Sequence, residues 1–231
     1  MLVRAVTVAL CATLCGAAAA DVTAARYAEP TTRYTHGILG DAIEFGALVM
    51  TVDGADVTLR LPQTHVFEDT APRLIDIDLD GIREVMVIET KMTEGARIAI
   101  YNGAGELVAA TPHVGRTNRW YAPVGAADLN GDGTVEVAFI DRPHLAKTLR
   151  VWRYDNGAFS EIAALEGVTN HRIGEADIAG GIRDCGNGPE MIVATADWSR
   201  LMAVRLTGDL TATDIGPHRG RDSFAAAMAC S

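Results

Sequence analysis

The feature that most constrains the fold is a nine-residue acidic loop that occurs twice, each time directly before a short apolar segment. The first copy is Asp76-Ile-Asp-Leu-Asp-Gly-Ile-Arg-Glu84, which precedes Val-Met-Val-Ile. The second is Asp128-Leu-Asn-Gly-Asp-Gly-Thr-Val-Glu136, which precedes Val-Ala-Phe-Ile. Both copies fit the pattern D-x-[D/N]-x-D-G-x-x-E. Internal recurrence of this kind predicts a repeat architecture in which each unit is a small group of strands.

The spacing of oxygen-bearing residues in these loops predicts two calcium sites. Calcium takes six to eight hard oxygen ligands, and the pattern offers side-chain oxygens at loop positions 1, 3, 5 and 9 and a backbone carbonyl at position 7. The predicted ligands of the first site are Asp76, Asp78, Asp80, Glu84 and the carbonyl of Ile82. Those of the second are Asp128, Asn130, Asp132, Glu136 and the carbonyl of Thr134. The alternative is an Asp- and Gly-rich turn held only by hydrogen bonds from side chain to backbone.

These loops are not EF-hands. An EF-hand has a glutamate at position 12 and a helix on either side. Here position 12 is Val87 or Phe139, and the flanking segments are rich in strand-forming residues. The predicted ions therefore lie in loops that connect strands.

Two weaker copies of the loop are expected. Asp177-Ile-Ala-Gly-Gly resembles its start and is followed, after additional residues, by Glu190-Met-Ile-Val. Ala179 stands where an oxygen ligand belongs, so no equivalent ion is predicted in this third copy. A fainter fourth copy begins at Asp41, before Gly46-Ala-Leu-Val-Met.

Short segments rich in Val, Ile, Ala and aromatic residues predict an all-β fold. The expected strands are Gly46–Val52, Val57–Leu61, Glu84–Thr90, Arg97–Tyr101, Glu136–Ile140, Thr148–Tyr154, Met191–Thr195 and Leu201–Leu206. Asn102-Gly103, Asn156-Gly157 and Gly208-Asp209 are typical hairpin turns. Helical periodicity is confined to Asp222–Cys230.

The repeats recur at roughly 50-residue intervals with about four strands each, which is how propeller blades look in sequence. Four such units account for nearly the whole chain after its first twenty residues. We therefore expect a single four-bladed β-propeller over residues 21–231, with a short C-terminal helix or tail. A β-sandwich and an open, partial propeller are the alternatives.

On these residues the chain resembles the VCBS/FG-GAP repeat family, whose relatives include the propeller of integrin α subunits. The resemblance covers Asp76–Gly103 and Asp128–Gly157 and is weaker over Asp177–Leu206. It implies a calcium-stabilised, extracellular propeller used for adhesion or ligand binding. The full phenylalanine-glycine and glycine-alanine-proline signature is absent, so the ligands of the family do not transfer to this chain.

The first twenty residues are typical of a secretory signal peptide. Arg4 is followed by an apolar run, Ala5–Cys15, and by small residues that predict cleavage after Ala20. The alternative, a membrane anchor, needs about 20 apolar residues. No second long apolar stretch follows, so we expect no transmembrane segment in the mature chain and export to the periplasm or the cell exterior.

The cysteine count then predicts one disulfide. Cys11 and Cys15 lie within the signal peptide, which leaves Cys185 and Cys230. An even pair in an oxidising compartment favours a disulfide that holds the C-terminal tail to the body of the protein. A catalytic or metal-binding thiol pair is the alternative.

The charge balance limits the class of partner. The chain has 20 Lys and Arg against 30 Asp and Glu, a formal net charge of −10. That excess argues against nucleic acid and anionic membranes as partners, because clustered positive charge supplies most of the attraction to both.

Positive and aromatic side chains gather in the connections at the other ends of the strands, in segments 111–120, 141–148, 169–173 and 196–200. The candidate ligand-binding residues there are Arg119, Arg142, His144, His171, Arg172, Trp198 and Arg200. One interpretation is a surface that binds an anionic or carbohydrate-like ligand through arginine forks and aromatic stacking. The other is that these arginines pair with nearby carboxylates while the tryptophans pack between blades.

Enzyme motifs are scarce, and no catalytic residue is predicted. The chain contains no H-E-x-x-H, G-x-S-x-G or phosphate-binding glycine loop. The first hypothesis is an exported calcium-binding module that recognises an unknown protein or glycan ligand. The second is a hydrolase or lyase that acts on an anionic substrate in the propeller funnel. A structural subunit of the cell envelope is a third.

Overall fold

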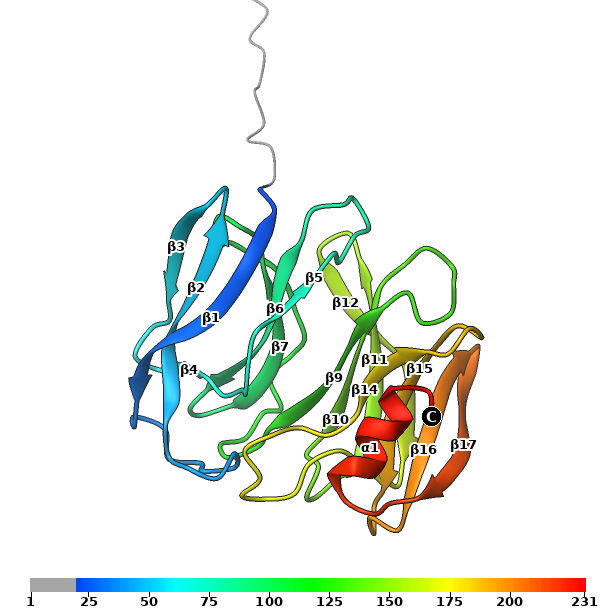
Figure 1. Cartoon of the computed structure of the whole chain (residues 1–231). Helices are drawn as coiled ribbons and strands as arrows, with labels where there is room; N and C mark the ends of the chain where they lie inside the picture. Colours follow the sequence, from blue (N-terminus) through cyan, green and yellow to red (C-terminus); the bar gives the residue numbers. More distant parts are fainter. Residues whose placement is uncertain (1–19) are drawn as a thin grey trace, which may run out of the picture.

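The computed structural model describes residues 20–231, which consist almost entirely of antiparallel strands (Figure 1). The predicted signal peptide lies outside the described residues apart from Ala20. The described part contains 17 strands and one helix, so the all-β class predicted from the sequence is confirmed. All eight predicted strands are present. Within residues 20–231 no helix has the length and apolar character needed to cross a membrane.

Most strands belong to β-meanders, in which each strand pairs with the next along the chain. The first meander comprises β1 (Val22–Thr31), β2 (Glu44–Val52) and β3 (Ala55–Arg60). The second comprises β5 (Arg73–Ile75), β6 (Glu84–Lys91), β7 (Gly95–Tyr101) and β8 (Leu107–Ala110). The third comprises β9 (Tyr121–Ala127), β10 (Glu136–Asp141), β11 (Thr148–Asp155) and β12 (Ala158–Glu166). The fourth comprises β14 (Gly181–Asp184), β15 (Pro189–Thr195), β16 (Arg200–Thr207) and β17 (Asp209–Pro217).

Two short strands extend this pattern. β4 (His65–Phe67) pairs with both β2 and β6, which joins the first and second meanders into one eight-stranded sheet. β13 (Val168–Thr169) pairs with β15 beside β14. In the second and fourth meanders the first strand is therefore broken, by residues 68–72 and 170–180, whereas β9 in the third meander is continuous.

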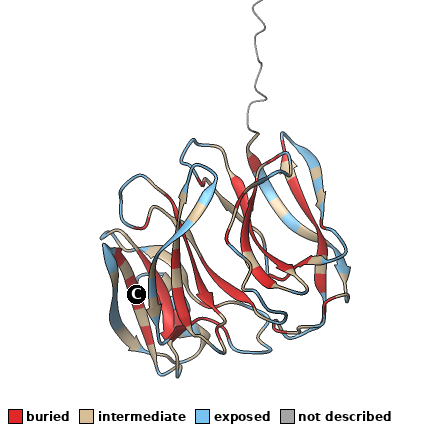
Figure 2. Ribbon diagram, turned by 180° about the vertical axis from the view of Figure 1, so that it is seen from behind, coloured by how far each residue is buried: buried red, intermediate tan, exposed pale blue. Residues whose placement is uncertain are grey.

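The middle strands bury both of their faces. Side chains along a strand point alternately to opposite sides, and in β6 they enter two different hydrophobic clusters. Val85 and Val87 pack with Leu48 of the first meander. Met86 and Ile88 pack into the large cluster shared with the third and fourth meanders. The sheets therefore stack face to face, with buried residues on the middle strands and exposed residues on the outer ones (Figure 2).

The fourth meander is covered on one side by the helix α1 (Arg221–Met228). Met191 and Val193 of β15 face the large shared cluster. Ile192 on the opposite face packs with Phe224 and Ala227 of the helix. The first and fourth meanders meet through loops, where the Gly174 N–H donates to the Ile38 carbonyl at 3.1 Å.

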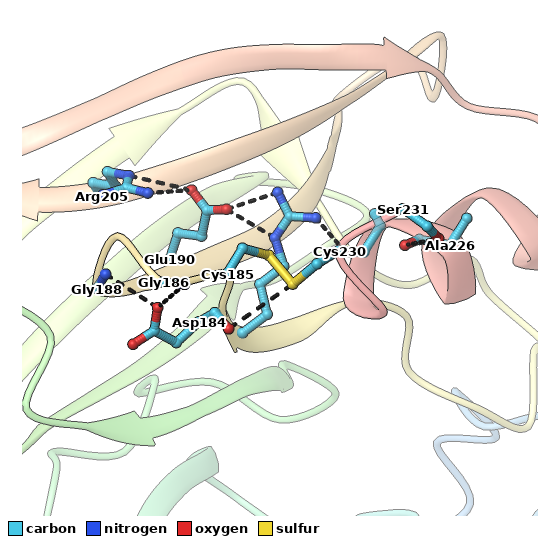
Figure 3. The surroundings of a disulfide bond; sticks show 11 residues. Asp184, Cys185, Gly186, Gly188, Glu190, Arg205, Ala226, Cys230 and Ser231 are labelled. Carbon is cyan, nitrogen blue, oxygen red and sulfur yellow. Dashed lines mark hydrogen bonds and ion pairs between the residues drawn. A yellow bond between two sulfur atoms is a disulfide. The ribbon is translucent and has the colours of Figure 1, made fainter.

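The predicted disulfide between Cys185 and Cys230 is confirmed (Figure 3). Cys185 lies in the β14–β15 loop and Cys230 follows α1, with their Cα atoms 5.7 Å apart. The Arg183 guanidinium also donates to the Ala227 carbonyl of the helix. Together these contacts hold the C-terminal segment on the fourth meander, as the cysteine pair predicted.

The pairing register corrects the position of the third acidic loop. In three meanders a glutamate at the first or second position of the second strand pairs with the residue just before the first aspartate of the loop, in the pairs Ile75–Glu84, Ala127–Glu136 and Arg183–Glu190. The third copy consequently starts at Asp184, not at the predicted Asp177. It was hidden because the loop is shortened and carries glycines, Gly186 and Gly188, where the other copies have Asp or Asn. Asp177 lies upstream and pairs with Arg221.

The predicted fourth copy at Asp41 is wrong. Asp41 lies between β1 and β2 and accepts a hydrogen bond from the Ile43 N–H at 2.8 Å. The loop around it approaches the segment between β13 and β14, at the end of the molecule away from the acidic loops (Figure 1). A single aspartate before an apolar strand is too short a signal to distinguish the two ends of a strand.

Candidate calcium loops and cationic pocket

The first acidic loop, between β5 and β6, brings its carboxylates together. Asp76, Asp78 and Glu84 each place one oxygen so that the three lie within 4.8 Å of one another. Glu84 Oε2 accepts the Ile77 N–H at 3.1 Å, which closes the loop on itself and leaves Oε1 for another partner. Burial raises the pKa of Glu84, and the negative charges of the neighbouring aspartates raise it further.

One carboxylate oxygen in this loop has no protein partner among the described residues. Asp76 Oδ2 accepts the Gly81 N–H at 2.9 Å. Asp76 Oδ1 is buried and has no hydrogen-bond partner. Leaving a buried carboxylate oxygen unpaired costs about 1–3 kcal/mol or more, and a bound cation removes that cost. The donor set of the first loop therefore fits calcium.

The second acidic loop, between β9 and β10, repeats the same backbone arrangement. Glu136 is fully buried and its Oε2 accepts the Leu129 N–H at 3.0 Å, as Glu84 does with Ile77. Asp128 accepts backbone N–H groups from Gly131 and Gly133 at 2.7 and 2.9 Å. The loop thus has the predicted turn chemistry and the predicted oxygen-bearing residues.

An arginine distinguishes the second loop from the first. Arg153 of β11 donates to Asp132 Oδ2 at 2.6 Å and to Glu136 Oε1 at 2.9 Å. Two of the predicted calcium ligands therefore already have a positive partner. In the first loop the neighbouring β7 residue is Tyr101, followed by Asn102, and neither is charged. For Asp132 to bind an ion in the second loop, its ion pair with Arg153 must break.

The third loop is held by arginines and glycines (Figure 3). Asp184 Oδ1 accepts the N–H groups of Gly186 and Gly188 at 2.8 and 3.1 Å. Glu190 accepts from Arg183 Nε at 2.8 Å and from Arg205 Nη2 at 3.1 Å. Because the loop has glycine at its third and fifth positions, it lacks the side-chain oxygens that the first two loops offer.

The three loops lie side by side at one end of the sheets. Asp78 of the first loop shares a shallow hollow with Gly133 and Thr134 of the second. Asn130 of the second loop shares another with Asn187 and Arg205 of the fourth meander. This placement agrees with the sequence analysis, which put the positive and aromatic connections at the other ends of the strands.

At the other end lies a pocket of about 220 Å³, which we call the cationic pocket. It is lined by His36, Ile38, Asn118, Arg119, Trp120, Arg142, Pro143, His144, Leu145 and Ile173. Three of the predicted ligand-binding residues, Arg119, Arg142 and His144, are therefore brought together here. They come from the β8–β9 and β10–β11 connections.

The two arginines of the pocket differ in how they are paired. Arg142 donates from Nε and Nη2 to both carboxylate oxygens of Asp141 at 2.7 and 2.9 Å. Arg119 forms no ion pair within residues 20–231, and its Nη1 donates to the Asn118 carbonyl at 2.7 Å. Arg119 is therefore the cation of the pocket whose charge has no protein counter-ion among the described residues.

A buried histidine supports the floor of the pocket. His171 is fully buried, and its Nε2–H donates to the Glu175 carbonyl at 2.8 Å. Its Nδ1 therefore accepts from His144 Nε2, which lies 3.3 Å away. Burial, together with the adjacent His171, lowers the pKa of His144 to about 4, so this imidazole is neutral at pH 7.

The remaining predicted ligand-binding residues lie away from the pocket. The Arg172 guanidinium stacks over Trp198, with its Cζ 4.2 Å from the ring centroid. Trp198 itself packs against Phe224 of α1. Arg200 pairs with Asp214 at 2.7 Å. Arg200, and Arg172 with Glu175 at 3.9 Å, thus have the carboxylate partners that the alternative interpretation described, whereas Trp198 packs against the C-terminal helix.

Sequence reasoning missed a histidine–glutamate pair at the pocket. His36 Nδ1 lies 2.5 Å from Glu68 Oε1. Glu68 is fully buried, and its Oε2 accepts the Thr90 hydroxyl at 2.6 Å. His36 and Glu68 belong to different loops that no motif or spacing connects, so the sequence carries no local signal for this pair.

Comparison with known proteins places one recognised element in this fold. The family model for an FG-GAP-like repeat matches residues 76–139, a stretch that runs from the first acidic loop into β10. The chain is thus an all-β protein that contains an FG-GAP-like repeat. No curated protein matches the chain.

Proposed function

We propose that the protein is an exported, calcium-stabilised β-propeller of the VCBS/FG-GAP kind that binds an anionic protein or glycan ligand in the cationic pocket. In this proposal each meander is one blade, and the whole is a four-bladed relative of the integrin α propeller. The FG-GAP-like repeat at residues 76–139 supports the propeller, and the predicted signal peptide supports export to the periplasm or the cell exterior.

The observation that carries the binding proposal is Arg119. The chain has ten more acidic than basic residues, yet this pocket-lining guanidinium has no ion-pair partner within residues 20–231. An arginine fork suits a carboxylate, sulfate or phosphate group because it donates two parallel hydrogen bonds. Leu145 and Ile173 at the pocket are 63% and 69% exposed, and they supply apolar contact for the body of the ligand.

Calcium has a structural role in this proposal. The first acidic loop lies at the end of the sheets away from the cationic pocket, so the ion there takes no part in ligand contact. It would bind the oxygens of Asp76, Asp78 and Glu84 and hold the β5–β6 connection in place. An ion that binds only the folded state stabilises it by mass action.

The test is a binding screen of residues 21–231 in excess calcium against acidic glycans and acidic peptides. We expect Arg119→Gln to abolish binding of the ligand found. Arg116→Gln is the matched control, because Arg116 is exposed in the same connection and does not line the pocket. Equal loss in both variants, or binding of neutral glycans only, rejects the proposal.

A second candidate function is a hydrolase or lyase acting on an anionic substrate in the same pocket. The observation that favours it is the His36–Glu68 pair, because a buried carboxylate that holds Nδ1 leaves Nε2 of the imidazole to take a proton from a substrate. His36→Gln is then expected to abolish turnover while Arg119-dependent binding persists. Binding without any detectable turnover of the identified ligand rejects the enzyme.

A further inference from the structure

We infer that His65, Glu89 and His113 form a binding site for a divalent transition-metal ion of the zinc type, separate from both the calcium loops and the cationic pocket. The three residues come from β4, from β6 and from the connection between β8 and β9. They are distant in sequence and converge only in the folded chain.

The candidate ligand atoms of the three residues lie close to one another. One atom from each residue falls within 4.8 Å of the other two, and His65 Nε2 is 3.8 Å from Glu89 Oε1. Zinc binds nitrogen and oxygen at about 2.0–2.2 Å, which puts neighbouring ligand atoms about 3.3 Å apart. Small side-chain rotations therefore suffice to surround an ion.

Both histidines are oriented by a hydrogen bond at the other ring nitrogen. His113 Nδ1 lies 2.8 Å from the Gly95 carbonyl, which can only accept, so Nδ1 carries the proton and Nε2 has a free lone pair. His65 Nδ1 lies 2.9 Å from the Thr64 hydroxyl, and its other ring nitrogen, Nε2, faces Glu89. Metal-binding histidines almost always have such a second partner, which fixes the ring and its tautomer.

Gly95 makes this arrangement possible because a Cβ there would lie 2.4 Å from the Arg116 carbonyl oxygen. The β8–β9 connection therefore packs tightly against the start of β7 and carries His113 to the site.

Glu89 is buried and held on its other side. Tyr101 donates its hydroxyl to Oε2 at 2.6 Å, and Arg97 Nη2 lies 3.0 Å from both oxygens. These contacts fix the carboxylate with Oε1 toward His65. The Arg97 charge opposes a bound cation, and the nearby Lys91 is paired with Glu94. The site is consequently expected to bind zinc more weakly than a structural site without an adjacent arginine.

The donor set selects zinc over calcium. Two imidazole nitrogens and one carboxylate suit a borderline ion such as Zn²⁺, whereas Ca²⁺ prefers oxygen ligands. Three protein ligands leave a fourth position for water.

The experiment titrates residues 21–231, kept in excess calcium, with Zn²⁺ by calorimetry and with Co²⁺ by visible absorption. We expect one saturable ion per chain and the intense absorption bands of tetrahedral Co²⁺. His65→Gln and His113→Gln should each weaken binding by at least about tenfold, the effect seen even for outer partners of metal ligands.

His218→Gln is the matched control, because His218 is a partly exposed histidine whose Nδ1 lies against the Trp198 carbonyl and which has no carboxylate partner in the described chain. The two histidine variants decide the test, since both side chains are partly exposed and their folding can be verified by thermal melting. Glu89→Gln disturbs Arg97 as well and serves only as support. Absence of a stoichiometric ion, or equal binding by the wild type and both histidine variants, overturns the inference.

Discussion

Arg153 donates to Glu136 at 2.9 Å and to Asp132 at 2.6 Å, so an arginine from the neighbouring strand is bound to two carboxylates of the second acidic loop. The first loop has the same length and the same carboxylate at its end, but its own Arg83 pairs with Asp21, and no arginine among the described residues pairs with the loop's carboxylates. Its Asp76 Oδ1 is buried and unpartnered instead. Two loops that are equivalent in sequence therefore differ in their need for a cation.

The first loop is expected to be the tighter calcium site. Asp78→Asn removes one of the three converging carboxylates and should weaken calcium binding there by at least tenfold, a change of about 1.4 kcal/mol. Calorimetry measures the affinity, and chelator should no longer lower the melting temperature as far as in the wild type. Asp53→Asn, in the exposed β2–β3 turn, is the control. An unchanged affinity in Asp78→Asn contradicts the ligand assignment.

Arg153→Gln should convert the second loop into a stronger calcium site. The substitution frees Asp132 and Glu136, so calcium affinity rises. Without calcium the variant should be less stable than the wild type, because the buried Glu136 loses its positive partner. Thermal melting with calcium and with chelator separates these two effects. Arg150→Gln on the same strand, which loses pairs with Asp141 and Glu161 only, should leave calcium binding unchanged.

Glu44 should make the protein less stable as the pH rises. This side chain begins β2 and is 2% exposed, and burial, with the negative charges of Glu68, Asp41 and Asp69 around it, raises its pKa from 4.5 to about 9. Because the pKa of Glu44 is higher in the folded than in the unfolded protein, its contribution to the free energy of unfolding is complete below pH 4.5. That contribution is lost as the pH rises toward 9. Between these limits the slope is up to about 1.4 kcal/mol per pH unit.

The variant Glu44→Gln tests this pH dependence. It should melt at the same temperature as the wild type near pH 4 and at a higher temperature near pH 8, because glutamine stays neutral. The exposed Glu166→Gln serves as the control. Parallel stability curves for Glu44→Gln and the wild type across this range would show that Glu44 is not the group responsible.

The disulfide should contribute substantially to stability. Cys185 and Cys230 are 45 residues apart, and closing a loop of that length stabilises by on the order of 4 kcal/mol in the chain-entropy model. The double variant Cys185→Ser/Cys230→Ser should lower the urea midpoint, and hydrogen exchange should increase first in α1. Reductant should lower the midpoint of the wild type but leave the double variant unaffected. Equal midpoints for oxidised and reduced protein contradict the prediction.

Most of the strands that the sequence predicted are buried middle strands, although the largely exposed β3 was also predicted and the largely buried β9 was missed. β6 and β10 bury every or nearly every residue, so their composition alone identifies them. β12 and β17 were missed because they are outer strands with mostly exposed side chains. β4 and β5 were missed because each has only three residues and the strand they form together is interrupted.

The sequence by itself determined the features that depend on neighbouring residues. These are the two acidic loops, the apolar strands that follow them, the hairpin turns and, through the parity of the cysteines, the disulfide. Turn chemistry and side-chain periodicity act over a few residues, so a local pattern is enough to predict them.

Only the tertiary structure decided which distant side chains meet. Pairing of β4 with β6 places His65 near Glu89, and the β8–β9 connection adds His113. Contact between two loops sets Glu68 beside His36, and cross-strand register sets Arg153 against Glu136 and fixes Asp184 as the start of the third loop. Such contacts depend on how whole sheets pack and on strand register, which a few neighbouring residues do not specify. The chemistry of the loops is therefore local in origin, whereas the cationic pocket and the proposed zinc site are products of packing.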